Sequence, residues 1–284
     1  MTATEPVIVN AALTGMVPTK ADNPNAPVTP DEIAADAEAC VEAGASVVHL
    51  HAREDDGRPT WRPQIYRRIV AAVRERCPEV VVCVSTSGRV FSELERRAAV
   101  LDLDGDEKPE FASLTLGSLN FPRQASVNEP GTIRALAERM AERGIVPELE
   151  VFELGMVDYA KYLIDRNVLR PPFVFNLLLG SLGTLAATPL NLALLVEALP
   201  TESVWAGAGI GRFQFPVNAL AVAMGGHVRV GLEDNLWLDA DKTRPATNVE
   251  LVRRVVRVTE AVEREIATPD VARQLLGLPV TASR

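Results

Sequence analysis

His49 and His51 lie two residues apart in a segment that begins apolar and turns polar, and they are two of the three histidines in the chain. In an extended strand, side chains i and i+2 point to the same face, so the two imidazoles would project together. Two neutral imidazoles that converge form half of a divalent-metal site and need carboxylate partners. The alternative is that both are ordinary core or surface histidines. For a His-x-His pair at a strand end we favour the metal site.

Short apolar segments alternate with amphipathic ones on both sides of this pair. A first strand is expected at 7–12, and a helix then begins at Pro30, after the N-cap Thr29 and with Glu32 in the capping-box position. Gly44 ends that helix before the strand that carries the histidines. Further strands are expected at 80–85, 111–115, 146–151, 173–178, 203–208 and 227–231, and further helices at 63–76, 92–101, 132–142, 156–166, 189–198, 215–224 and 248–265.

These segments make eight strand–helix units in 284 residues. Apolar strands that alternate with helices indicate a parallel sheet covered by helices, and eight units fit a (β/α)₈ TIM barrel, for which about 250 residues is typical. We therefore expect an α/β protein with one barrel domain over 1–284. The competing architecture, an open doubly wound sheet, is weakened because no Gly-x-Gly-x-x-Gly follows the first strand.

The composition is that of a soluble globular protein, with 47% hydrophobic and 24% charged residues. The uncharged stretch 173–196 contains polar and helix-breaking residues, so we expect no membrane span. A net charge of −9 argues against a nucleic-acid partner. The three separated cysteines fit buried thiols of a reducing compartment, and the N-terminus lacks a signal-peptide pattern. We expect a cytoplasmic protein.

In a barrel of this type, the chemistry takes place where the strands end. Polar residues do gather at the predicted strand ends: Ser85, Thr86, Ser87, Gly88, Ser113, Thr115, Glu148, Glu150, Arg229, Glu233 and Asp234. Because strands 8, 1 and 2 are neighbours in a closed barrel, Glu233 can reach a metal that His49 and His51 face. Two histidines and one glutamate leave a zinc-like ion with open positions, as catalytic sites require.

Two charged residues flank this predicted ligand. Asp234 can stay free as a general base, or it can be a helix N-cap or an Asx turn. Arg229 can pair with Asp234 or Glu150, or it can clamp a substrate carboxylate. After strand 7 comes the glycine-rich run Gly207-Ala208-Gly209-Ile210-Gly211-Arg212. It is a weak phosphate-binding motif, and its glycines alternatively serve only a tight turn.

With these residues in place, the sequence closely resembles the β-keto acid cleavage enzymes through nearly its whole length. The segments that carry the resemblance are Ala12-Leu13-Thr14-Gly15, Pro27-Val28-Thr29-Pro30-Asp31-Glu32-Ile33, His49-Leu50-His51-Ala52-Arg53-Glu54-Asp55-Asp56-Gly57, Leu116-Gly117-Ser118-Leu119-Asn120-Phe121, Pro147-Glu148-Leu149-Glu150-Val151-Phe152, Gly209-Ile210-Gly211-Arg212 and Gly225-Gly226-His227-Val228-Arg229-Val230-Gly231-Leu232-Glu233-Asp234-Asn235. So many segments in one order are far more specific than any single motif.

The resemblance implies a zinc-dependent (β/α)₈ enzyme, with other divalent metals possible, that converts a β-keto acid and acetyl-CoA into acetoacetate and a new acyl-CoA. It implies His49, His51 and Glu233 as metal ligands and Asp234 as the base, supported by Arg229 and Glu150. It also implies that Ser85, Gly88 and Ser113 hold the keto acid, and that the protein is a homo-oligomer, a tetramer in the family. Acetyl-CoA is the co-substrate.

One departure from the family concerns the acyl tail of the substrate. The aminohexanoate-cleaving members carry a glutamate for the substrate's ammonium in the loop after Thr14-Gly15, and here Val17 takes that place. An ammonium would find no charge partner at Val17, so we expect a neutral or apolar tail. Two other functions stay open: a metal-dependent aldolase or decarboxylase that needs no CoA, and a catalytically silent barrel that binds a metabolite or metal.

Overall fold

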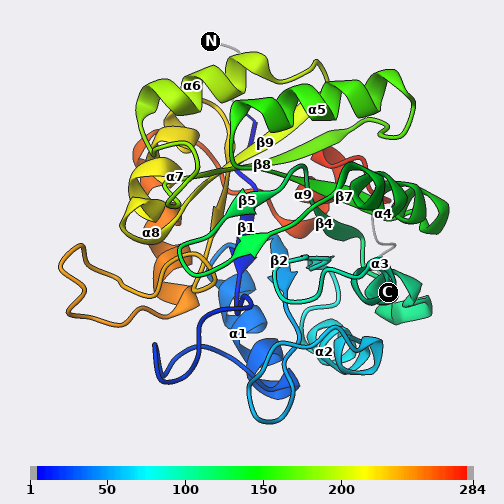
Figure 1. The fold of residues 1–284 in the computed structure, drawn as a ribbon. Coiled ribbons are helices and arrows are strands. Elements are labelled where there is room, and N and C mark those ends of the chain that lie inside the picture. Colours follow the sequence, from blue (N-terminus) through cyan, green and yellow to red (C-terminus); the bar gives the residue numbers. More distant parts are fainter. Residues whose placement is uncertain (1–4, 280–284) are drawn as a thin grey trace.

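The structure is a computed structural model that describes residues 5–279, and its centre is a closed barrel of eight parallel strands. Around the barrel the strands follow the order β1-β10-β9-β8-β7-β4-β3-β2, and Figure 1 shows the helices outside them. The strands are β1 (Val9–Ala12), β2 (Val47–Leu50), β3 (Val81–Val84), β4 (Phe111–Thr115), β7 (Val146–Val151), β8 (Phe173–Leu179), β9 (Ser203–Gly209) and β10 (His227–Val230). The predicted (β/α)₈ fold is confirmed.

The helices fall between the strands as the alternating pattern predicts. They are α1 (Pro30–Glu42), α2 (Pro63–Arg76), α3 (Leu94–Ala98), α4 (Pro130–Arg143), α5 (Leu154–Asp165), α6 (Pro189–Ala198), α7 (Gln214–Ala223), α8 (Asn248–Ala261) and α9 (Pro269–Leu275). Three short 3₁₀ turns accompany them: η1 (Ala99–Asp102), η2 (Gly105–Glu107) and η3 (Gly211–Phe213). Among residues 5–279, no helix is long and apolar enough to cross a membrane.

The start of α1 shows how local sequence sets these boundaries. The Thr29 side chain accepts a hydrogen bond from the Glu32 backbone amide (3.2 Å), and the Glu32 carboxylate accepts one from the Thr29 amide (3.0 Å). This reciprocal pair satisfies two amides that the first helical turn leaves without partners. Prolines also stand in the first turn of α2, α4, α6 and α9, where their missing N–H costs nothing. The predicted capping box is confirmed.

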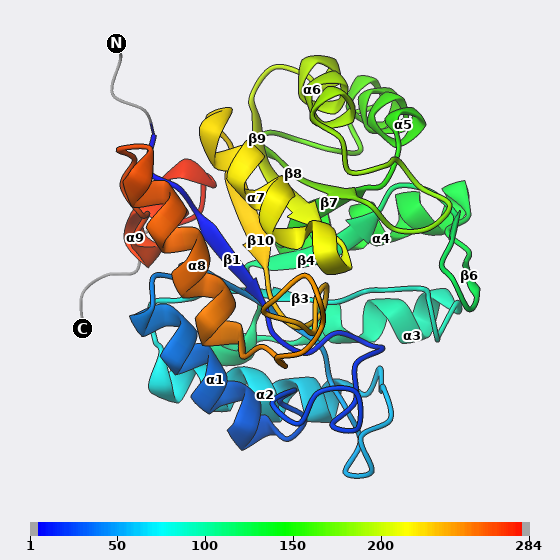
Figure 2. The same cartoon turned by 90° about the vertical axis from the view of Figure 1, so that its left-hand side faces the viewer.

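The N-terminal end of the barrel is closed by a separate apolar cluster. Ala272 of α9 and the following Leu276 pack with the first residues of several strands, including Ile8, Val47 and Phe111. Figure 2 shows α9 at the opposite end of the barrel from strand β6 (Ala125–Ser126), which pairs antiparallel with β5 (Leu119–Asn120). In the described residues this cluster fills the N-terminal end, and the pocket opens at the carboxyl ends of the strands.

Three features were not expected from the sequence. The helix predicted at 92–101 is divided into α3 and η1, the β5–β6 hairpin has strands of two residues each, and α9 follows α8. Two-residue strands are too short to produce an alternating pattern. For α9 a start signal does exist, because the Thr268 side chain caps the helix and Pro269 follows it.

Candidate active site

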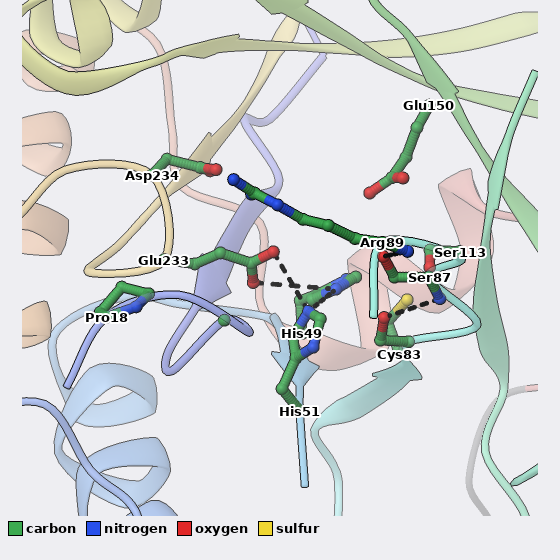
Figure 3. Close-up of polar contacts among 12 residues, drawn as sticks. Pro18, His49, His51, Cys83, Ser87, Arg89, Ser113, Glu150, Glu233 and Asp234 are labelled. Carbon is green, nitrogen blue, oxygen red and sulfur yellow. Dashed lines mark hydrogen bonds and ion pairs between the residues drawn. The ribbon is translucent and has the colours of Figure 1, made fainter. Parts of the chain in front are cut away.

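Three side chains at the end of β2 and after β10 converge on one point. The Nε2 atoms of His49 and His51 are 3.3 Å apart, and Glu233 Oε1 is 3.1 Å from His51 Nε2. Glu233 Oε2 is 3.8 Å from His49 Nε2. Figure 3 shows the Glu233 carboxylate facing both imidazoles. The structure thus brings together the three residues predicted as metal ligands.

The barrel topology explains how Glu233 arrives there, 182 residues after His51. β1 pairs with both β2 and β10, so the loops after β2 and β10 are separated only by the one after β1. In that intervening loop, Gly15 has a φ of +68°, and a Cβ added to it would lie 2.6 Å from Glu233 Cγ. Gly15 therefore provides both the left-handed backbone and the space that the Glu233 side chain needs.

Behind His49, the second imidazole nitrogen is held by a buried carboxylate. Glu148 of β7 accepts from His49 Nδ1 (2.9 Å) and from Asn10 Nδ2 (2.7 Å). Burial alone would raise the pKa of Glu148, but the neighbouring His49 and Arg229 lower it to about 2. A carboxylate on Nδ1 directs the Nε2 lone pair toward the metal position. Glu148 was not assigned this role from the sequence, although it shares a strand face with Glu150, which the resemblance implied as a support for Asp234.

The donor set fits a divalent metal ion. His49, His51 and Glu233 offer two nitrogens and one oxygen that lie within 4.8 Å of one another. Glu233 Oε2 is buried and makes no hydrogen bond to the residues that the structure describes. A buried carboxylate oxygen without a partner is costly unless a cation binds it. Three protein ligands of this kind suit zinc and leave coordination positions open for a substrate.

A second convergent group consists of His49, Cys83 and Glu148. Burial raises the pKa of the Cys83 thiol well above its usual value, which favours the protonated form. Its Sγ lies 3.3 Å from Glu148 Oε2, to which it donates. A protonated thiol is a poor metal ligand. In this arrangement Cys83 supports Glu148.

Arg229 connects the remaining acidic groups. It is 1% exposed and contacts Glu150 (3.3 Å), Glu233 (2.8 Å) and Asp234 (3.0 Å). Burial raises the pKa of Asp234, the Glu233 carboxylate raises it further, and Arg229 acts in the opposite direction. For Glu233, Arg229 and the histidines outweigh burial and hold the pKa well below its usual value. Asp234 is thus the more basic of the two adjacent carboxylates.

Glu150 occupies the opposite side of this network. Its side chain is buried, and it accepts a hydrogen bond from Thr115 Oγ1 (2.7 Å) while facing the Arg229 guanidinium. Burial raises the pKa of Glu150, although the charge of Arg229 reduces the shift. The pairing of Arg229 with both Asp234 and Glu150 agrees with the first of the two roles considered for Arg229.

A pocket of about 490 Å³ opens over these residues. Its floor includes His51, Arg229, Glu233 and Asp234. Its wall is formed mainly by loops after the strands, with the lining residues Val17, Ser85, Ser87, Arg89, Thr115, Phe121, Phe152, Leu178, Ile210, Gly211 and Trp237 among others. A concave site of this size, with a few polar groups converging at its floor, is typical of small-molecule binding.

Only some of the residues predicted to hold the keto acid line the pocket. Ser85 and Val17 line the pocket, whereas Ser113 and Gly88 do not. The Ser113 hydroxyl accepts a hydrogen bond from the Thr86 backbone amide (3.2 Å), so it supports the loop after β3 from behind. A Cβ on Gly88 would lie 2.7 Å from Arg97 Nη1, which shows that Gly88 packs against that arginine. Ser113 and Gly88 therefore shape the loop that presents Ser85.

Of the predicted phosphate-binding residues, only Gly211 borders the pocket. Its backbone amide donates to the Asp234 carbonyl (2.7 Å), and it thereby helps to position the loop after β10. Gly209 ends β9, and Arg212 lies over the Phe213 ring at 4.9 Å. A role of this run in binding CoA stays a prediction.

The fold and the site define a class: a (β/α)₈ enzyme whose strand ends carry a group of two histidines and one glutamate beside a second carboxylate that is paired with an arginine. Residues 6–278 match the β-keto acid cleavage enzyme family. The chain belongs to this family, as the sequence resemblance predicted.

Individual relatives agree with this assignment. The 3-keto-5-aminohexanoate cleavage enzyme of Fusobacterium nucleatum is 43% identical over 276 residues, 96% of this chain and 98% of the relative. The 3-oxoadipate:acetyl-CoA acetyltransferase of Cupriavidus necator is 37% identical, over 97% and 96% of the two chains. Among solved structures, a ternary complex of ObcA with a C4-CoA adduct and oxalate has a TM-score of 0.80 at 25% identity, over 90% of this chain and 68% of that one.

Proposed function

We propose that the protein is a zinc-dependent acyltransferase that converts a β-keto acid and acetyl-CoA into acetoacetate and a new acyl-CoA. The observation that carries the proposal is the convergence of His49, His51 and Glu233 beside the free carboxylate of Asp234, in a chain of the β-keto acid cleavage family. The relative from Cupriavidus necator is named as an acetyl-CoA acetyltransferase, which supports acetyl-CoA as the co-substrate here.

A divalent ion held by His49, His51 and Glu233 would supply Lewis acidity to the oxygens of the keto acid. The protein's own contribution is to fix the three donors before any ligand arrives. His49 is oriented by Glu148, and Glu233 is packed against Gly15 and paired with Arg229. Preorganised donors of this kind need no rearrangement during the reaction.

Asp234 is the residue that we assign to remove a proton from C2 of the keto acid. It borders the pocket, it adjoins the metal ligand Glu233, and burial raises its pKa, which strengthens it as a base. Arg229 Nε holds one carboxylate oxygen at 3.0 Å and so fixes the direction of the group. Arg229 is in turn held by Glu150 on its other side.

The bond changes that follow balance without any covalent attachment to the protein. C2 of the deprotonated keto acid attacks the acetyl carbonyl and forms a carbon–carbon bond. The CoA thiolate then moves from the acetyl carbon to C3 of the keto acid. Cleavage of the original C2–C3 bond releases the acyl-CoA, and C2, now part of acetoacetate, takes back the proton that Asp234 held.

The acyl tail is proposed from the pocket wall. Val17 lines the pocket, is 44% exposed, and stands where the aminohexanoate-cleaving members resembled by this chain carry a glutamate. Without a carboxylate at this place, an ammonium-bearing tail loses its charge partner. From Val17 alone, a neutral or apolar tail is favoured over a cationic one.

The test is an acetyl-CoA-dependent assay over β-keto acids of graded tail length and charge, with the acyl-CoA product separated by chromatography and the bound metal quantified. The proposal predicts acyl-CoA and acetoacetate in equal amounts, and one zinc ion for each chain. Consumption of the keto acid at the same rate without acetyl-CoA would instead indicate a decarboxylase or an aldolase. Metal binding without turnover of any keto acid would indicate a silent barrel.

A further inference from the structure

Arg89 is a cation in the pocket wall for which the catalytic machinery gives no role. It lies in the loop after β3, and its side chain reaches across the site toward Asp234 in Figure 3. Its guanidinium carbon lies 3.8 Å from the centre of the Phe121 ring. Within residues 5–279, its Nε is buried without a hydrogen bond, and no carboxylate lies within 4.0 Å of the group. Partial burial of a guanidinium is costly unless an anion pairs with it, so this group lacks the partner that its charge requires.

The backbone that carries Arg89 is fixed. Arg97 is buried and donates to the Thr86 carbonyl (2.8 Å), which anchors the start of the loop. The Arg89 amide donates to Ser87 Oγ (3.3 Å), and the Arg89 carbonyl accepts from Gln124 Nε2 (2.9 Å). Together with the aromatic stacking, these contacts hold the guanidinium in place. A bound anion would therefore cost little ordering of the side chain.

The other charges of the pocket wall do not neutralise Arg89. Arg229 is matched by the surrounding acidic groups of the floor. Asp22 is the acidic lining residue outside that floor cluster, and its carboxylate accepts hydrogen bonds from the Thr19 backbone amide and hydroxyl. Arg123 and Lys242 also line the pocket, so cationic side chains outnumber anionic ones in the wall outside the floor cluster.

We propose that Arg89 binds a carboxylate at the end of the substrate's acyl tail, so that the preferred substrate is a β-keto dicarboxylic acid. This inference rests on the proposed function and narrows its substrate class. A planar guanidinium with free donors is suited to bidentate contact with a carboxylate. Val17 argues only against a cationic tail, and Arg89 favours an anionic tail over the neutral or apolar one that Val17 alone suggests.

The position of Arg89 favours the tail carboxylate as its ligand over two other anions, the reacting carboxylate of the keto acid and the phosphates of CoA. Arg89 is more than 4.0 Å from both Glu233 and Asp234, whereas the reacting carboxylate is one carbon away from the C2 that Asp234 must reach. All three side chains line the same pocket, so one keto acid can reach both ends of it. The phosphates of CoA are separated from its thioester by the whole pantetheine arm, which is too long to end there.

The experiment compares two keto acids with the same carbon skeleton, 3-oxoadipate and 3-oxohexanoate, which differ only in a terminal carboxylate. We expect the unmodified enzyme to prefer 3-oxoadipate. Arg89→Leu, which retains apolar contact with Phe121, should lower kcat/KM for 3-oxoadipate by roughly 10- to 100-fold and leave that for 3-oxohexanoate within about twofold. The KM for acetyl-CoA should not change. Arg166→Leu, which removes an exposed arginine over the Tyr162 ring outside the pocket, is the matched control.

Each alternative has its own result. Equal losses for both keto acids would overturn the proposal in favour of the reacting carboxylate, and a raised KM for acetyl-CoA would overturn it in favour of a CoA phosphate. Arg89→Lys keeps the charge without the planar fork, should retain part of the preference for 3-oxoadipate, and carries the test if Arg89→Leu does not fold. If the unmodified enzyme forms acyl-CoA only from 3-oxohexanoate, the proposal fails and the proposed function stands. If it forms none from either acid, the proposed function fails as well.

Discussion

Glu148→Gln tests whether the carboxylate behind His49 tunes the metal centre. Glu148 accepts from three donors, His49 Nδ1 at 2.9 Å, Asn10 Nδ2 at 2.7 Å and Cys83 Sγ at 3.3 Å. A glutamine removes the negative charge, and its amide nitrogen cannot accept, so one donor loses its partner. Loss of such an orienting carboxylate typically weakens metal binding by about 10- to 100-fold, or about 1.4–2.7 kcal/mol. Separately, the donor left without a partner should lower the free energy of unfolding by about 1–3 kcal/mol.

The assay is a zinc competition titration against a fluorescent chelator, with thermal unfolding of the apo and zinc-loaded forms measured beside it. Glu110→Gln is the matched control, because Glu110 also accepts from several donors, Arg74 (2.6 Å), Arg273 (2.8 Å) and the Val82 amide (2.9 Å), but lies outside the pocket. Both variants should lose stability, and only Glu148→Gln should lose zinc affinity. A zinc affinity within about twofold of the unmodified protein would refute the tuning role of Glu148.

Three further predictions concern the metal, the tail and pH. His49→Ala should lose metal and activity together, whereas Asp234→Asn should keep its metal, measured by elemental analysis, and lose kcat by about 100-fold or more; near-normal turnover would exclude Asp234 as the base. Val17→Glu should raise the relative kcat/KM for amino-bearing keto acids, and an unchanged ratio would show that this loop does not select the tail. Burial lowers the pKa of His227 from 6.5 to about 4, so the unfolded state binds the proton first and stability is lost as pH falls from 6.5 to 4. Urea unfolding should show that His227→Gln removes about 3 kcal/mol of this loss, and identical pH profiles would contradict the assignment.

The barrel was predictable because its signals are local and repeated. Apolar strands of four to seven residues, capping residues such as Thr29 and first-turn prolines each mark one boundary, and eight such units leave few alternatives. The convergence of His49, His51 and Glu233 followed from the same topology, because β1 pairs with both β2 and β10. The two-residue strands of the β5–β6 hairpin produce no periodic pattern, and for α9, which has seven residues, the sequence signal is its start at Thr268 and Pro269.

The parts of the site that were not predicted depend on side-chain direction. From the sequence, Ser113 and Gly88 were equivalent to Ser85, yet of the three only Ser85 lines the pocket. The Thr86 amide in the loop after β3 binds the Ser113 hydroxyl, and Gly88 packs against Arg97. Glu148 was visible as a polar residue, but its pairing with His49 across the barrel interior has no sequence signal. Arg89 carried no motif, and its place in the pocket wall, its stacking on Phe121 and its Nε, unpaired among the residues that the structure describes, identify it. The oligomeric state stays a prediction.

The fate of a labelled acetyl group tests the central claim most directly. The purified enzyme is given a β-keto acid and acetyl-CoA labelled with carbon-13 in both acetyl carbons, and the products are identified by mass spectrometry. Acyl transfer predicts that both labelled carbons appear in acetoacetate, and that the acyl-CoA carries the unlabelled acyl group of the keto acid. Unlabelled acetoacetate, or a decarboxylated ketone with the labelled acetyl-CoA left intact, would contradict the account.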